Sequence, residues 1–102
     1  MKTVIIDPGH GGIDTGATAF GLRESKVNLE IATHVRNELL RHYDVTVLMT
    51  RTADKTISLD ERTNFANAQN ADVYVSIHHN AGGGRKMGRA RRRLWPANHR
   101  YL

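Results

Sequence analysis

Three short β-rich runs, separated by stretches with helix signals, constrain this chain more than any other feature. The runs cover residues 4–6, 45–49 and 73–77. A strand, a helix and a second parallel strand form a right-handed crossover, and repeated crossovers build a parallel sheet with helices packed on it. The sequence therefore predicts an α/β fold with a mainly parallel sheet and flanking helices, which we expect to be incomplete at the C-terminus.

The two connections between these runs carry different helix signals. Over residues 24–42, apolar side chains recur at every fourth position, which predicts an amphipathic helix. In the second connection, Ser58 and Glu61 have the spacing of a capping box, so a helix is expected to begin there and to end near residue 68. The apolar stripe of the first helix is Val27, Ile31, Val35 and Leu39, widened by Ala32 and Leu40.

The absence of cysteine limits how this chain can bind a metal. The chain has 102 residues, a length that normally forms one domain, and it has no cysteine. Neither a disulfide nor a thiolate metal site can form, so any metal must be held by histidine and carboxylate side chains. Such ligands are typical of catalytic zinc sites.

The positive charge of the chain lies at its C-terminal end. The formal net charge is +5, with −2 from residues 1–84 and +7 from residues 85–102. The composition changes at the glycine run 82–84, so we expect residues 1–84 to be the folded part and residues 85–102 to be a basic tail. Because the excess charge is confined to this tail, a nucleic-acid partner is not expected.

Two of the three predicted strands lead into histidines. His10 follows the first strand in a glycine-flanked loop, where the backbone can approach a ligand closely. His78 follows the third strand, where a buried polar side chain is costly unless it is paired. The carboxyl ends of parallel strands meet at one edge of a sheet, so both are expected on the same rim. The neighbouring His79 should point the opposite way by strand alternation. The histidines for which we expect no metal role are His34, His42 and His99.

Glu24, at the start of the first predicted helix, is a candidate third ligand. It reaches the rim if the loop from His10 folds back over the sheet edge. Two histidines and one glutamate would leave an open position for water on a zinc ion, lowering the pKa of that water toward about 7. The alternative is an acidic residue that only favours the helix N-terminus through the helix dipole. Spacing alone leaves both interpretations open.

A series of short motifs runs over residues 3–82. In order, they are Ile6-Asp7-Pro8-Gly9-His10-Gly11-Gly12, Asp14-Thr15-Gly16-Ala17, Gly21-Leu22-Arg23-Glu24, Asn28, Thr50-Arg51, Leu59-Asp60-Glu61-Arg62, Ala66-Asn67 and Ser76-Ile77-His78-His79-Asn80-Ala81. Their order and spacing resemble the zinc-dependent N-acetylmuramoyl-L-alanine amidases found among sporulation lysins and phage endolysins. These enzymes hydrolyse the amide between N-acetylmuramic acid and L-alanine in peptidoglycan. The resemblance therefore implies an amidase, of which this chain carries the N-terminal part.

The resemblance also implies roles for individual residues. It implies that His10, Glu24 and His78 bind Zn²⁺, and that the ligand of the histidine pair is the first and not the second. Asp7 and Asn80 flank the ligands in these motifs, and we expect them to support the ligands without binding the ion.

One part of the family pattern has no match in the chain. The general base of the family is a second glutamate nearer the C-terminus, whereas no acidic residue follows Asp72 here. No catalytic residue is therefore assigned, and slow or absent turnover is expected. The arginine-rich sequence beyond residue 84 is interpreted as a change of reading frame or a truncated copy.

The basic tail also has a functional interpretation. Arginines 91–93 beside Trp95 have the charge and stacking surface to bind phosphates of an anionic wall polymer, of nucleic acid or of phospholipid headgroups, and of these we expect the wall polymer. The alternative function for the chain is then a non-catalytic zinc- or wall-binding module with an anion-binding tail.

The N-terminal apolar run bears on where the protein acts. It covers only residues 4–6, which is too short for a signal peptide or a membrane span. The resemblance implies action at the bacterial cell wall. Without a signal in the chain, we expect the protein to be released by cell lysis or by a phage route.

Overall fold

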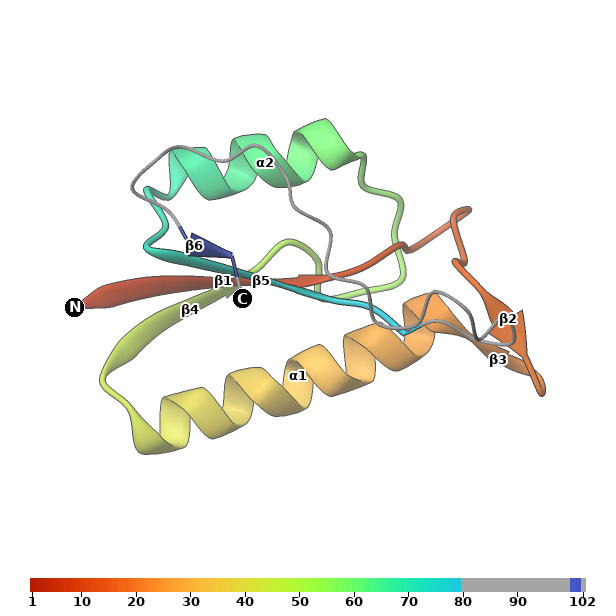
Figure 1. The fold of residues 1–102 in the computed structure, drawn as a ribbon, viewed down its shortest axis with the longest axis horizontal. Coiled ribbons are helices and arrows are strands. Elements are labelled where there is room, and N and C mark those ends of the chain that lie inside the picture. The colour runs from red at the N-terminus through yellow and green to blue at the C-terminus, as the bar shows by residue number, and fades with distance from the viewer. Residues whose placement is uncertain (80–99, 102) are drawn as a thin grey trace.

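The computed structural model describes residues 1–79 and 100–101 and shows a sheet between two helices (Figure 1). The sheet has the strand order β4-β1-β5-β6, and all of its neighbouring strands are parallel. The strands are β1 (Lys2–Pro8), β4 (Val45–Met49), β5 (Val73–Ile77) and β6 (Arg100–Tyr101). The prediction of an α/β fold with a mainly parallel sheet and flanking helices is confirmed.

β1 is hydrogen-bonded to β4 on one side and to β5 on the other. Its side chains Ile5 and Ile6 are both fully buried, as expected for a parallel strand with a helix on each face. At its end, Pro8 is paired with Ile77 of β5. The two strands therefore finish at the same rim of the sheet, and the segments that follow them begin side by side.

α2 (Leu59–Ala68) covers one face of the sheet (Figure 1). The predicted capping box is present: the Glu61 N–H donates to the Ser58 hydroxyl at 3.0 Å, and the Ser58 N–H donates to the Glu61 carboxylate at 2.8 Å. Beneath this helix lies the main cluster of buried side chains. It consists of Ile5, Ala66, Ala71 and Tyr74, with Leu48 and Phe65 packed against it.

α1 (Glu24–His42) covers the opposite face and has the expected bounds. The predicted apolar stripe is wrong in part, since Ile31 is 41% exposed and Leu40 is 51% exposed. The buried positions of the helix are Glu24, Ser25, Asn28 and Ala32. Polar side chains face inward at the N-terminal end of α1 because this end lies at the rim where β1 and β5 finish.

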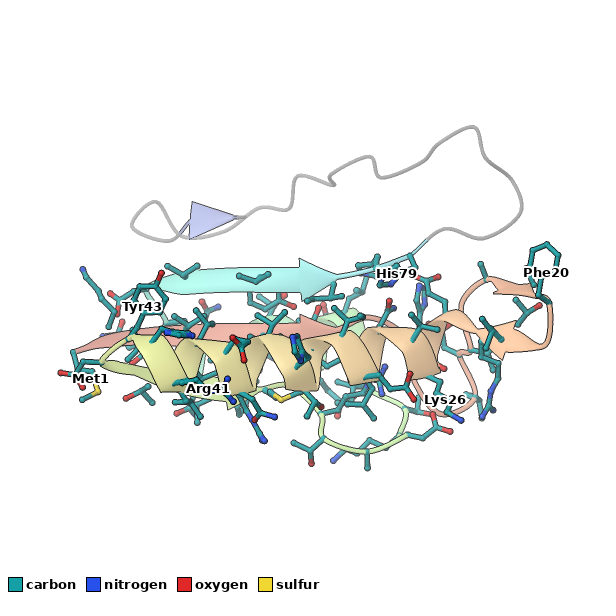
Figure 2. The ribbon with its side chains drawn as sticks, turned by 90° about the horizontal axis from the view of Figure 1, so that it is seen from below. Met1, Phe20, Lys26, Arg41, Tyr43 and His79 are labelled. Carbon is teal, nitrogen blue, oxygen red and sulfur yellow. The ribbon has the colours of Figure 1, made fainter. Side chains whose placement is uncertain are left out.

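A short hairpin precedes α1 and was not predicted. It consists of β2 (Thr18–Ala19) and β3 (Leu22–Arg23), paired antiparallel. Phe20 lies between them and is almost fully exposed. Figure 2 shows Phe20 and His79 toward the same end of the molecule, with Met1 and Tyr43 at the opposite end.

The basic tail contributes one described element. β6 pairs with the start of β5, Val73 with Arg100 and Tyr74 with Tyr101. This strand was not predicted from the sequence. The other tail residues that the sequence singled out, including residues 91–93 and Trp95, lie outside the described residues. Within residues 1–79 and 100–101, neither helix has the length and apolar character needed to cross a membrane.

Candidate metal centre

Three predicted ligands converge at the shared rim of β1 and β5. His10, Glu24 and His78 each offer one ligand atom, and these atoms lie within 4.8 Å of one another. His10 Nε2 is 3.2 Å from Glu24 Oε1, and His78 Nδ1 is 3.2 Å from Glu24 Oε2. Among residues 1–79, no other three histidine or acidic side chains gather in this way.

The Glu24 carboxylate lies between the two histidines and is held by three donors. The Ala17 N–H donates to Oε1 at 3.1 Å, and the His79 N–H and Asn28 Nδ2 donate to Oε2 at 2.9 and 3.2 Å. Burial alone would raise the pKa of Glu24, but these hydrogen bonds and the nearby His10 lower it below its ordinary value. The carboxylate is therefore ionised at neutral pH.

Asp14 holds the His10 ring from the side opposite Glu24. Its Oδ2 lies 2.9 Å from His10 Nδ1, so Nε2 is left to face Glu24. The hydrogen bond to His10 is the main reason that the pKa of Asp14 lies below its ordinary value. No role for Asp14 was predicted from the sequence. A carboxylate four residues after a glycine-flanked histidine was the available signal.

His78 packs against the ring of His10, but 41% of its side chain is exposed, so the sequence expectation of a buried side chain here is wrong. Burial, followed by the charge of His10, lowers its pKa below the ordinary histidine value. Its ring makes an edge-to-face contact with the His10 ring, with centroids 5.0 Å apart and an angle of 89°. The neutral form is the one that binds a metal.

His79 lies beside the three-residue group and not away from it. Its Nδ1 is 2.7 Å from Asn28 Oδ1, and Asn28 in turn donates to Glu24. Strand alternation failed to place this side chain because β5 ends at Ile77, so His79 is outside the strand. His79 is not one of the three converging side chains.

Two glycines leave room for the side chains of the centre. A Cβ on Gly9 would lie 2.3 Å from the His78 ring, and a Cβ on Gly16 would lie 2.7 Å from Glu24 Oε1 and from the His10 ring. Gly16 also has a φ of 70°, a conformation that other residues adopt at a cost. The loop approaches the ligands closely only because both positions lack a side chain.

Asp7 lies under the loop and does not touch the three converging side chains. It is fully buried and pairs with Arg62, and it accepts hydrogen bonds from Thr50 at 2.7 Å and Ser76 at 2.9 Å. Burial would raise its pKa, but the Arg62 charge and these hydrogen bonds lower it below the ordinary value. Asn80, the other residue expected to support the ligands, lies outside the described residues.

The sequence analysis also assigned no role to two buried arginines. Arg51 follows β4, Arg62 is on α2, and both donate to carbonyl groups of residues 8–10. Both belong to the motifs that carry the family resemblance, which was the available signal.

The sequence of the chain matches one protein family. The family model described as N-acetylmuramoyl-L-alanine amidase matches residues 4–90. This chain belongs to the N-acetylmuramoyl-L-alanine amidase family, which confirms the resemblance seen in its motifs.

Curated relatives agree with this assignment. The chain is 55% identical over 85 residues to N-acetylmuramoyl-L-alanine amidase CwlM of Bacillus licheniformis, covering 82% of this chain and 34% of the relative. It is 49% identical to the sporulation-specific amidase of Bacillus subtilis strain 168 (82% and 33%), and 44% identical to the endolysin of Bacillus phage SPP1 (83% and 31%). The chain thus spans about a third of the length of each of these relatives.

Solved structures show the same fold. The catalytic domain of CwlV, an amidase from Paenibacillus polymyxa, aligns with a TM-score of 0.77 at 37% identity, over 82% of this chain and 48% of that domain. An N-acetylmuramoyl-L-alanine amidase from Clostridium difficile 630 aligns with a TM-score of 0.75 at 45% identity, over 81% of this chain and 46% of the other.

Proposed function

We propose that residues 1–84 are the N-terminal, zinc-binding part of an amidase domain that hydrolyses the amide between N-acetylmuramic acid and L-alanine in peptidoglycan. The observation that carries the proposal is the convergence of His10, Glu24 and His78 at one rim of the sheet. Family membership supplies the reaction, and the relatives' names point to action at the bacterial cell wall.

The three side chains suit a zinc ion. Two ligands of a tetrahedral zinc ion, each bound at about 2.0–2.1 Å, lie roughly 3.4 Å apart. Glu24 Oε1 is 3.2 Å from His10 Nε2, and Glu24 Oε2 is 3.2 Å from His78 Nδ1. With one ligand atom taken from each side chain, the three atoms lie within 4.8 Å of one another. Two imidazoles and a glutamate form a ligand set of catalytic zinc sites, which keep one position open. Asp14 on the far nitrogen of His10 is the kind of outer partner that orients a metal-binding histidine.

The chain's own residues prepare the site for this chemistry. When bound, zinc would polarise the amide carbonyl and lower the pKa of its water toward about 7. Glu24 is kept ionised by its hydrogen-bond donors, and the pKa of His78 lies below its ordinary value, which favours the neutral ring. Gly9 and Gly16 keep the loop close to these side chains. The protonation states that suit metal binding, an ionised Glu24 and a neutral His78, are therefore favoured by the protein itself before any substrate binds.

A second candidate function is a non-catalytic zinc- or wall-binding module whose basic tail binds an anionic wall polymer. The observation that favours it is the lack of any acidic residue after Asp72. We propose residues 85–102 as the tail, carrying a net charge of +7. A nucleic-acid partner is not proposed, since residues 1–84 carry a net charge of −2.

The test is to incubate the zinc-loaded chain with purified peptidoglycan and to follow two products. Amidase action releases new amino groups on L-alanine and no new reducing sugars, and removing zinc with a chelator should abolish the release. Zinc binding without any new amino groups would favour the non-catalytic module. New reducing sugars, or no zinc binding, would contradict the proposed function.

A further inference from the structure

Two buried arginines lie behind the loop that carries His10. Resting on the function proposed above, we propose that Arg51 and Arg62 are positioning residues that fix the two peptide planes beside His10 and so aim its imidazole at the metal position. Neither arginine is one of the three converging ligands. Both act through the backbone of residues 8–10.

The backbone of His10 needs external support. Its φ is 62°, in the left-handed region. A residue with a Cβ adopts this region at a cost of roughly 1–2 kcal/mol. Such a conformation persists only where surrounding contacts over-determine it. The contacts that do so here fall on both sides of His10.

Arg51 holds the peptide plane before His10. Its Nη2 donates to the Gly9 carbonyl at 2.8 Å, and its Nε donates to the Pro8 carbonyl at 3.0 Å. The same Nη2 also donates to the Ser25 carbonyl at 2.8 Å, at the start of α1. The plane between Gly9 and His10 is therefore tied to the helix that carries Glu24.

Arg62 holds the peptide plane after His10. Its Nη2 donates to the His10 carbonyl at 2.8 Å, and its Nη1 donates to the Pro8 carbonyl at 2.8 Å. Asp7 pairs with the same Nη1. This plane is therefore tied to α2 and to the central strand.

Fixing these two planes fixes the direction of the His10 side chain. The angles φ and ψ of a residue are the rotations of its two flanking peptide planes about Cα. With both planes held, the Cα–Cβ bond has one direction, and it brings His10 Nε2 to 3.2 Å from Glu24 Oε1. Asp14 then sets the rotation of the ring through Nδ1.

Packing alone does not account for this pair. Within the part of the chain that the structure describes, the four hydrogen bonds of Arg51 all go to backbone carbonyls. Its burial and the like charge of Arg62 lower its pKa below the ordinary value, and the charges of Asp54 and Asp7 only partly oppose this. A buried charge next to another of the same sign is costly, and apolar residues of similar volume often replace such groups without loss of stability. A guanidinium presents its donors in a fixed planar fork, so it holds two or more carbonyls in one defined arrangement, whereas the ammonium of a lysine is a compact charge on a flexible stem.

The experiment uses two variants, Arg51→Lys and Arg62→Lys. Each replaces a planar guanidinium with an ammonium group, which keeps the charge but loses the fixed arrangement of donors. Zn²⁺ affinity is measured by competition with a chromophoric chelator, and folding by thermal unfolding. We expect the Kd for Zn²⁺ to rise roughly 10- to 100-fold in both variants, as when outer partners of a metal ligand are lost. Arg41→Lys, on the exposed face of α1, controls for the substitution itself. Ile5→Val, in the core, controls for lost stability; both controls should bind Zn²⁺ as the parent chain does.

A measurement on the metal-free protein separates this proposal from the proposed function. The imidazole NMR resonances of His10 should shift in the two lysine variants, which keep the charge, and not in Ile5→Val. If the parent chain bound no zinc, the proposed function would fail while these resonances still tested the positioning. Unchanged His10 resonances, or unchanged Zn²⁺ affinity in folded lysine variants, would overturn the proposal. A lysine variant that does not fold is replaced by glutamine at the same position, which keeps amide donors.

Discussion

Asn28 donates a hydrogen bond to Glu24 across one turn of α1, with 3.2 Å between Asn28 Nδ2 and Glu24 Oε2. The same Nδ2 donates to the Gly9 carbonyl at 3.1 Å, and Asn28 Oδ1 lies 2.7 Å from His79 Nδ1. Asn28 is fully buried. It therefore connects α1, the loop of His10 and the segment after β5. Of the two adjacent histidines, His79 is bonded to Asn28, whereas His78 belongs to the three converging side chains.

The first prediction concerns these two histidines. His78→Ala should abolish zinc retention, because it removes one of three converging ligands. His79→Ala should leave most of the zinc bound, because the backbone N–H that holds Glu24 remains. The measurement is metal content after dialysis, at matched protein concentration. Equal losses in the two variants would mean that the wrong member of the pair is assigned as the ligand.

The second prediction concerns the space beside His78. In Gly9→Ala the new methyl group would lie 2.3 Å from the His78 ring, so the ring must move and zinc affinity should fall at least about 10-fold. Gly21→Ala is the matched control, since nothing lies within 4 Å of its Cβ and its only cost is a φ of 76°. We expect this control to lose about 1 kcal/mol of stability and no zinc affinity. A similar loss of affinity in both variants would contradict the steric explanation.

The third prediction concerns acid stability. The pKa of Asp7 is lower in the folded protein than its ordinary value of 3.8, so its contribution to stability is present above that pH and is lost as the pH falls through the folded pKa. Ser76→Ala removes one hydrogen bond to the carboxylate and should cost about 1.5–3 kcal/mol at pH 7. The difference between the variant and the parent should shrink below about pH 3.8. Urea unfolding of both proteins, from pH 7 to below pH 3.8, measures the difference in their free energies of unfolding. A difference that does not change with pH would exclude Asp7 as its cause.

The fourth prediction concerns the tail. If residues 85–102 bind an anionic wall polymer, deleting them should abolish a binding that weakens steeply with salt, because neutralised phosphates release counterions. The measurement is cosedimentation with cell walls that carry or lack their phosphate polymers, between low and high salt. Zinc content should not change on deletion, since the three converging side chains lie in residues 1–79. Binding unaffected by the deletion would leave the tail without this function.

Local signals in the sequence predicted the elements, because those signals act within a few residues. The bounds of α1, the capping box at Ser58 and the strand Val73–Ile77 each depend on periodicity or on a short hydrogen-bonded motif. The shared rim followed from the direction of parallel strands. These are the parts of the fold that neighbouring residues decide.

The features that were not predicted, namely the buried face of α1 and the contacts of Arg51 and Arg62, depend on residues far apart in the sequence. The face that α1 buries is set by Glu24 and Asn28 meeting the rim, and not by the apolar stripe that includes Ile31. Arg51 and Arg62 act on a loop that is more than 40 residues away in the sequence, with separations of 42 and 52 for two of their hydrogen bonds. Membership of the family motifs marks these two arginines, but periodicity and spacing do not distinguish them from arginines on the surface.

The last prediction concerns turnover, and it depends on the proton-transfer group. The resemblance places the general base of these amidases in a later segment, whereas no acidic residue follows Asp72 in this chain. Among residues 1–79, the nearby carboxylate of Asp14 is already bonded to His10. We therefore expect these 102 residues to release amines from peptidoglycan at least about 100-fold more slowly than a version extended by the corresponding segment of a relative.

The comparison requires that both proteins carry the same amount of zinc, because adding a segment can change zinc affinity. Rates are measured at saturating Zn²⁺, with the His78→Ala variants of both proteins as blanks. A rate gap that persists at equal zinc occupancy locates the deficit in proton transfer and in the placement of the substrate. Equal rates would show that these 102 residues already contain a proton acceptor. His79, whose Nδ1 is held by Asn28, would then be the first residue to substitute.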